Sequence, residues 1–257
     1  MSIRHSCLAV LCLLLPATMA DAQSSSNDYT DAELAAARDA LWDSHGAQIN
    51  YLFISERLEY QSNGGEAVGV WEAQGWVGSD VNKLWLKTEG EFEFEGSEVE
   101  EAEVQALYSR AVGPFWDFQA GIRHDIRPEP SRTHAVLGFQ GLAPYWFELD
   151  TALFLSDEGV ASARLEAEYE LRLTQRLILQ PRLELNVAFD DDEAIDLGRG
   201  VSESELALRL RYEIRREFAP YLGIAWRASF GDTRDIIEEA GGSAEELSIV
   251  AGLRFWY

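Results

Sequence analysis

The sequence predicts an all-β protein: a transmembrane antiparallel up-and-down β-barrel of about 12 strands with a short N-terminal helix. Three observations predict this fold. Apolar and polar side chains alternate in segments of roughly ten residues over most of the chain, so each segment has one apolar face. A leader typical of exported proteins precedes these segments. The last segment, residues 247–257, alternates up to an aromatic final residue, Tyr257, as is typical of outer-membrane proteins of Gram-negative bacteria.

The leader, residues 1–22, has the three parts of a cleaved signal peptide. Arg4 supplies positive charge, residues 8–15 form an apolar run too short to cross a membrane as a helix, and residues 20–22 offer an A-x-A cleavage site. Cleavage removes both cysteines and both methionines of the chain, so the mature protein has no sulfur ligand. We therefore expect export and a location in the cell outer membrane.

The chain is strongly acidic. It has 45 acidic and 21 basic residues, a net charge of −24 and a pI near 4.4. This balance argues against nucleic acid as a partner. A focused negative potential in a lumen or at its mouth would attract cations. Solubility and repulsion from an anionic lipid surface explain the acidity equally well, so charge alone does not choose between these roles.

Residues 23–46 are expected to form a short periplasmic segment with one helix. Thr30 is its N-cap, Glu33 completes a capping box, and Gly46 ends it. Residues 47–257 are expected to form the barrel in outer-membrane lipid. The predicted strands are residues 47–60, 67–78, 83–95, 101–112, 116–127, 133–142, 146–156, 161–173, 177–189, 204–215, 219–230 and 247–257.

The connections between these strands alternate between short and long. Tight turns contrast with acidic, glycine-rich connections such as residues 190–203 and 231–246, which matches periplasmic turns and extracellular loops. Register is strongly specified, because a one-residue slip would move lumen charges into lipid at a cost of roughly 2–4 kcal/mol for an arginine at mid-bilayer. Pro181 falls on the lipid face, where it cannot donate a ladder hydrogen bond. A soluble β-sandwich also alternates, but it seldom carries unbroken rows of charge on one face.

Five long blocks carry a specific resemblance: residues 75–91, 99–125, 137–150, 163–186 and 208–224. Together they resemble the copper resistance protein B family over nearly the whole barrel. The resemblance implies an outer-membrane protein for copper tolerance that binds copper without holding it tightly, or passes it outward. It also implies partnership with a periplasmic copper oxidase or copper carrier. Many family members have a Met- and His-rich N-terminal region, whereas residues 23–46 contain no methionine and one histidine, His45.

Acidic side chains are expected to line one wall of the lumen and to offer Cu(II) a path of oxygen ligands. These are Glu89, Glu91, Glu93, Glu101 and Glu103. The alternative is an internal salt-bridge network that satisfies the same carboxylates and closes the lumen. The arginines of that network are Arg123, Arg164, Arg172, Arg182, Arg209, Arg211 and Arg227.

The three histidines of the mature chain are the other candidate copper ligands. His134 is expected to face the lumen beside Asp125, with His124 on the outward rim and able to join them only through a bulge. His45, near the barrel entrance, would be a lone and weak ligand. His134, Asp125 and Ser131 also suggest a hydrolase, but no surrounding motif supports one, so we expect no enzymatic activity. A general cation-selective porin is the remaining alternative.

Overall fold

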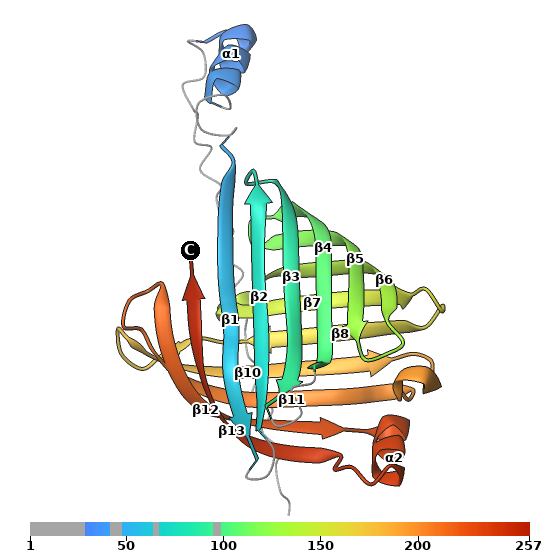
Figure 1. Cartoon of the computed structure of the whole chain (residues 1–257). Helices are drawn as coiled ribbons and strands as arrows, with labels where there is room; N and C mark the ends of the chain where they lie inside the picture. Colours follow the sequence, from blue (N-terminus) through green and yellow to red (C-terminus); the bar gives the residue numbers. More distant parts are fainter. Residues whose placement is uncertain (1–28, 42–47, 64–66, 95–98) are drawn as a thin grey trace, which may run out of the picture. The chain divides into compact units, whose positions relative to one another are not determined.

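The computed structural model describes residues 29–41, 48–63, 67–94 and 99–257 (Figure 1). The chain divides into two units, residues 1–45 and 46–257. In the first unit, α1 (Asp31–Leu41) begins with the predicted capping box. The Glu33 backbone N–H donates to the Thr30 Oγ1 at 3.3 Å, and the Thr30 backbone N–H donates to the Glu33 Oε2 at 2.8 Å. Gly46, the predicted end of the helix, lies outside the described residues.

The second unit is a closed antiparallel barrel. Its strands are β1 (Asn50–Ser62), β2 (Ala67–Gly78), β3 (Asn82–Glu93), β4 (Val99–Gly113), β5 (Trp116–Arg127), β6 (Arg132–Ala143), β7 (Phe147–Ser156), β8 (Ala161–Glu168), β9 (Leu171–Arg172), β10 (Leu177–Ala188), β11 (Gly200–Tyr212), β12 (Phe218–Ser229) and β13 (Glu245–Trp256). Apart from β9, which pairs with β10 alone, each strand pairs with the next one along the barrel, and β1 pairs with β13 to close the sheet. Because β8 and β9 both pair with β10 and share one position, the barrel has the twelve strands that the sequence predicts.

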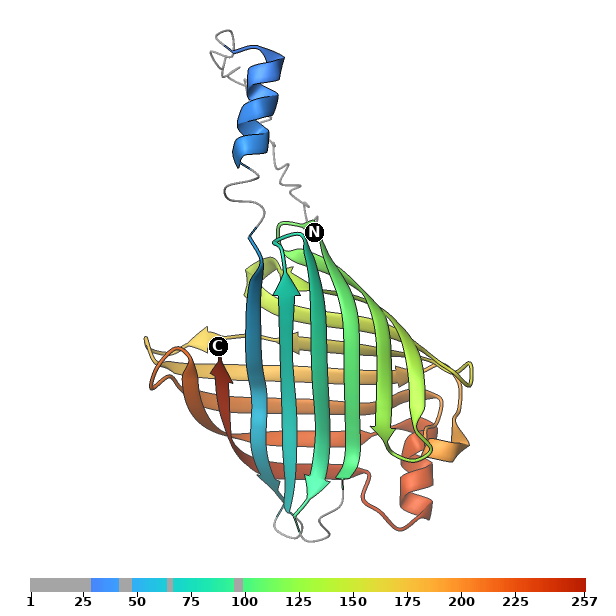
Figure 2. The ribbon, with the colours of Figure 1, turned by 45° about the horizontal axis from the view of Figure 1, so that its top comes forward.

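The strands form two crossing layers. β1 to β6 run side by side in one layer, and the later strands cross behind them at a steep angle (Figure 2). Side chains that point inward from one layer therefore meet side chains from the other. Residues far apart in the sequence can pair directly across the lumen.

The two ends of the barrel differ as predicted. At one end the connections are short, as at residues 79–81, 114–115 and 213–217, and the chain enters β1 and leaves β13 there. At the other end two connections are long, residues 189–199 and 230–244. We call these the turn end and the loop end; in outer-membrane barrels they face the periplasm and the exterior.

The long connections contain structure that the sequence analysis did not predict. Residues 189–199 include the short helix η4 (Glu193–Ile195), and residues 230–244 include α2 (Gly231–Glu239), which packs against β11. An Arg234–Glu238 ion pair at 2.7 Å, one helical turn apart, supports α2. The glycines at or just beyond the ends of α2, at positions 231, 241 and 242, made residues 230–244 read as a loop in the sequence.

The predicted eighth strand, residues 161–173, is not continuous. β8 ends at Glu168 and the ladder resumes with β9 at Leu171. The gap lies opposite Pro181 of β10, because Glu168 pairs with Arg182 and Leu171 pairs with Leu179. The Tyr169 N–H donates to the Pro181 carbonyl at 3.2 Å, but proline has no N–H for the return bond. The exposed proline thus interrupts its neighbour without a bulge in its own strand.

A bulge in β1 changes the alternation that the sequence predicts. Between Ser55 and Arg57 the pairing with β2 shifts by one residue, so Glu56 and Arg57 both lie on the lumen side. Glu56 pairs with Arg254 of β13, while Arg57 contacts Glu72 of β2 at 2.7 Å. The bulge thereby supplies two adjacent charged side chains to the lumen.

The two faces of the sheet separate apolar from charged residues. Leu84 and Leu86 of β3 are 51% and 56% exposed on the outer face, whereas Arg209 and Arg211 of β11 are 3% and 1% exposed inside. The predicted sidedness of both strands is therefore confirmed. Among the described residues, no helix has the length and apolar character needed to cross a membrane.

Candidate functional site: a charged lumen

Two rows of carboxylates face each other across the lumen. In the first layer, register places Glu72, Glu89, Glu103 and Asp125 in line on successive strands β2 to β5. In the second layer, the same occurs for Asp150, Glu166, Glu184 and Glu205 on β7, β8, β10 and β11. Like charges directly opposite on neighbouring strands destabilise a sheet, so each row needs cations from elsewhere.

Arginines from the opposite layer supply those cations. Arg164 of β8 contacts Glu89 of β3 and lies 3.2 Å from Glu103 of β4. Arg182 of β10 contacts Glu166 at 2.9 Å, Glu184 at 3.0 Å and Glu205 at 3.2 Å. It also reaches across to Glu72 of β2 at 3.5 Å. Ion pairs thus tie the two layers together through the lumen.

A second group of ion pairs centres on Glu205, whose side chain is 4% exposed. Arg57 lies 3.3 Å from it, Arg209 3.4 Å and Arg227 3.7 Å, in addition to Arg182. Burial of this carboxylate is tolerable only because several cations and hydrogen bonds replace its water.

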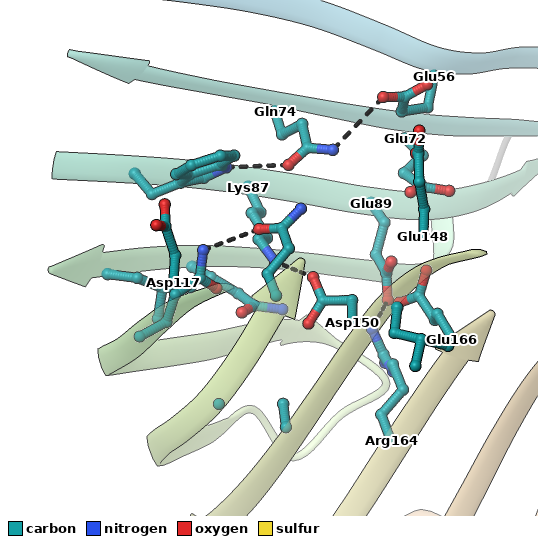
Figure 3. A pocket seen from close by; sticks show the side chains of 18 of the residues that line it. Glu56, Glu72, Gln74, Lys87, Glu89, Asp117, Glu148, Asp150, Arg164 and Glu166 are labelled. Carbon is teal, nitrogen blue, oxygen red and sulfur yellow. Dashed lines mark hydrogen bonds and ion pairs between the residues drawn. The ribbon is translucent and has the colours of Figure 1, made fainter. Parts of the chain in front are cut away.

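Two cavities lie along the lumen, and we call them chambers. The turn-side chamber, of about 360 Å³, reaches Phe115 and Asp117 near the short turns. The loop-side chamber, of about 390 Å³, reaches Ile195 and Ile237 in the long connections. Figure 3 shows the turn-side chamber, with Lys87 directed at Asp150 and Arg164 directed at Glu89. The two chambers share four of their lining residues: Glu89, Glu103, Phe154 and Arg164.

Six of the seven arginines predicted for the internal network form ion pairs inside the barrel. They are Arg123, Arg164, Arg182, Arg209, Arg211 and Arg227. Arg172 is at the exposed edge of the network, because its side chain is 60% exposed and lies 3.6 Å from Glu170, the partner of Arg211. It lies on β9, beyond the interruption opposite Pro181 and close to the turn end. Arg57 is a further member that alternation along β1 does not predict, because it reaches its partners from the bulge.

The acidic path predicted from the sequence is largely occupied by these arginines. Glu89 and Glu103 share Arg164, and Glu91 accepts from Arg227 at 2.9 Å. Glu101 is exposed and lines the loop-side chamber, and Glu93 is half-buried at the end of β3. The predicted carboxylates therefore do lie on one wall, and cations would have to compete with arginine for three of them.

The structure brings His134 and Asp125 together, as the sequence predicts. The His134 Nε2 lies 3.0 Å from the Asp125 Oδ2, and Asp125 also accepts two hydrogen bonds from Arg123, at 2.5 and 3.0 Å. Since Asp125 is ionised beside Arg123, the His134 Nε2 is the donor. In the neutral imidazole the Nδ1 carries the lone pair, and this buried atom has no hydrogen-bond partner among the described residues. Asp125 orients the imidazole in the way that carboxylates orient metal-binding histidines.

The other two histidines do not join this pair. The register is regular from His124, which pairs with Thr133, to Arg123, which pairs with His134, so no bulge turns His124 inward. His124 is exposed, and its Nδ1 lies 3.0 Å from the Thr133 Oγ1. His45 lies outside the described residues. Within the described parts of the chain, no three His, Cys, Asp or Glu side chains are grouped to hold a metal ion.

The two long connections form a cap at the loop end, which we define as residues 189–199 and 230–244. Thr233 of α2 is buried and bonds both ways to Gly198, accepting from its N–H at 2.9 Å and donating to its carbonyl at 3.2 Å. Asp192 accepts two hydrogen bonds from Arg132 of β6, at 2.9 and 3.0 Å. These bonds hold the pKa of Asp192 below its ordinary value, so the carboxylate stays ionised at neutral pH.

A closed barrel with an apolar outer face and a charged lumen defines an outer-membrane β-barrel protein. A solved structure of the NanC porin shares this fold with a TM-score of 0.53, at 12% sequence identity, over 80% of this chain and 99% of that one. The family model for the copper resistance protein B precursor (CopB) matches residues 49–257. The chain belongs to the copper resistance protein B family.

Two curated relatives agree with that assignment. The chain is 46% identical to copper resistance protein B of Escherichia coli over 213 residues, which is 83% of this chain and 71% of the relative. It is 43% identical over 214 residues to a copper resistance protein B homolog of Pseudomonas syringae pv. tomato (strain ATCC BAA-871 / DC3000), over 83% of this chain and 72% of the relative.

Proposed function

We propose that this barrel serves copper tolerance at the outer membrane, with copper as a cargo that passes outward along the acidic lumen. The observation that carries the proposal is the pair of carboxylate rows that line the lumen in a member of the copper resistance protein B family. Retention of copper inside the lumen is the other form of the same role.

Coordination chemistry supports a weakly held cargo. Carboxylate oxygens are hard ligands, and they bind copper less selectively than thiolate or thioether sulfur. A negative lumen raises the local cation concentration, and ligands shared with arginine release a bound ion readily. His134, with its free Nδ1, offers one nitrogen ligand along the way. A periplasmic copper oxidase or copper carrier is the partner we expect at the turn end.

The first test compares cell-associated copper in a deletion strain and in the same strain carrying the wild-type gene, both under copper challenge. We expect more copper in the deletion strain, because outward passage is lost. Less copper in the deletion strain would instead support retention or uptake. Equal copper, together with altered uptake of unrelated small solutes, would contradict the proposal and favour a general porin.

A triple variant tests the acidic wall itself. Replacement of Glu89, Glu91 and Glu93 by glutamine should lower copper tolerance toward that of the deletion strain. Two of these changes remove one carboxylate partner each from Arg164 and Arg227, and all three make the lumen more positive. Growth on graded copper measures the effect, and heat-modifiable migration on gels confirms a folded barrel.

A matched triple variant controls for the loss of three charges. Glu129, Glu158 and Glu239 are exposed residues in connections, and their replacement by glutamine should leave tolerance unchanged. Unchanged tolerance in the Glu89, Glu91 and Glu93 variant, with the barrel folded, would eliminate the acidic wall as a copper path.

A further inference from the structure

We infer that Arg164 is the constriction of the barrel, and that its ion pairs with Glu89 and Glu103 keep the two lumen chambers from forming one continuous pore. This inference goes beyond the proposed function, because it concerns the passage of any small ion. It starts from the four residues that line both chambers, Glu89, Glu103, Phe154 and Arg164, which we call the septum.

The septum crosses the lumen because Arg164 reaches from one layer to the other. It leaves β8 and contacts Glu89 on β3 and Glu103 on β4, residues 75 and 61 positions away in the sequence. Its Nε donates to the Asn186 Oδ1 at 3.1 Å, and Glu184 lies 3.7 Å from the same nitrogen. All three guanidinium nitrogens therefore have an acceptor, and the side chain is only 12% exposed.

Phe154 fixes the position of this guanidinium. Its ring centroid lies 5.8 Å from the Arg164 Cζ and 4.8 Å from the Arg123 Cζ, within the range of cation–π attraction. Phe154 is itself buried against Leu107 and Val136. Arg123 adds a second cation to Glu103 at 2.7 Å. The septum is thus a packed, fully paired unit that leaves the guanidinium little freedom to swing aside.

The chemistry of the septum predicts what its opening would select. Loss of the guanidinium leaves Glu89 without a cation partner among the described residues, and it leaves Glu103 with Arg123 alone. A gap lined in this way favours cations over anions. A cation that enters the intact lumen must take the place of the arginine on these carboxylates. Selectivity then depends on how well that cation competes with a planar bidentate donor.

The test is ion conductance of the purified full-length mature barrel in planar lipid bilayers with KCl and no copper. We expect low conductance for the wild type and at least a tenfold increase for Arg164→Ala, with a reversal potential that shows cation selectivity. Arg164→Lys keeps the charge but loses the planar fork, so it should give an intermediate conductance.

Arg254→Ala is the matched control. It removes the same side chain from the lumen wall, where Arg254 pairs with Glu56 at 2.7 Å, but it leaves the septum intact. Its conductance should stay at the wild-type level. Residues 23–257 contain no cysteine, so Arg164→Cys gives an independent readout. A thiol reagent that adds an ammonium group should reduce its conductance, whereas a sulfonate reagent should not.

Four results would overturn the inference. They are a folded Arg164→Ala barrel that conducts like the wild type, an Arg164→Lys barrel that conducts like the wild type, a wild type that already conducts as well as the variants, and an equal increase in Arg254→Ala. A rise in Asp192→Asn alone would place the barrier at the cap instead of the septum. Because no copper is present, failure here leaves the copper proposal to its own test.

Discussion

At the residue scale, the ion-pair network of the lumen depends on a few carboxylates that each pair with several arginines. Glu205 is the clearest case, because Arg57, Arg182, Arg209 and Arg227 all lie within 4 Å of it. These four arginines lie on β1, β10, β11 and β12, so the Glu205 side chain connects four strands. Removal of one member of a buried ion pair is costly, because the remaining charges keep their desolvation without their partner.

We therefore predict that Glu205→Gln lowers the free energy of unfolding by about 3 kcal/mol or more. Unfolding in urea from lipid vesicles, followed by tryptophan fluorescence, measures this difference. Glu129→Gln is the control, because Glu129 is 74% exposed and its partner Arg127 is 44% exposed, so their pair contributes little. An equal and small effect of both substitutions would show that water in the lumen replaces the lost carboxylate.

At the scale of elements, the cap shows how two loops become ordered at the mouth of a barrel. Neither connection has an extensive apolar face, and their order comes from specific polar contacts. These are the Thr233–Gly198 bonds between the connections and the Arg132–Asp192 pair that ties them to β6. Ile195 and Ile237 then lie over the loop-side chamber. We therefore expect that loss of these contacts loosens the cap without disturbing the strands.

The Arg132–Asp192 pair gives the cap a pH dependence of known sign. The pKa of Asp192 is lowered in the folded protein. The ion pair therefore stabilises the cap fully above the ordinary pKa near 3.8, and this stabilisation is lost as the pH falls through the lowered pKa. We predict that amide protection of residues 189–199 and 230–244 is constant from pH 8 to pH 5 and falls only in stronger acid.

Hydrogen–deuterium exchange, corrected for the intrinsic pH dependence, measures this protection. Asp192→Asn should show low protection in the cap at every pH, with unchanged protection in the strands. Glu193→Gln is the neighbouring control and should match the wild type. A wild-type cap that loses protection already between pH 8 and pH 5 would mean that another group controls it.

At the scale of the whole molecule, the barrel is closed where its first strand, β1, meets its last strand, β13. The Phe53 N–H donates to the Tyr257 carbonyl at 2.9 Å, and the Tyr257 N–H donates to the Phe53 carbonyl at 2.8 Å. The ring of Tyr257 also lies beside that of Tyr51, with centroids 6.2 Å apart. The last residue thus supplies both backbone closure and an aromatic side chain at the turn end.

We predict that deletion of Tyr257 lowers the yield of folded barrel in cells more than Tyr257→Ala does. The deletion removes both closing hydrogen bonds but leaves Trp256 as an aromatic terminus, whereas the substitution keeps the bonds and removes the ring. Heat-modifiable migration of outer-membrane fractions measures the yield. If the substitution is the more harmful change, the terminal ring matters more than closure.

The sequence by itself determined the number of strands, their sidedness, the alternation of turns and loops, and the capping box at Thr30. These features follow from local periodicity and turn chemistry, which every residue carries with it. The sequence also predicted that His134 lies beside Asp125, because neighbouring strands with a short connection have a predictable register.

Only the tertiary structure decided how the lumen charges pair. Arg57 enters the lumen through a bulge, Arg172 lies at the exposed edge of the network beyond the gap opposite Pro181, and Arg164 finds its acceptors on strands of the opposite layer. Such pairings depend on how far each side chain reaches across a barrel whose two layers cross. The alternation of residues along one strand gives no information about that distance. The septum and the cap exist for the same reason: both join segments that are remote in sequence and meet only when the sheet closes.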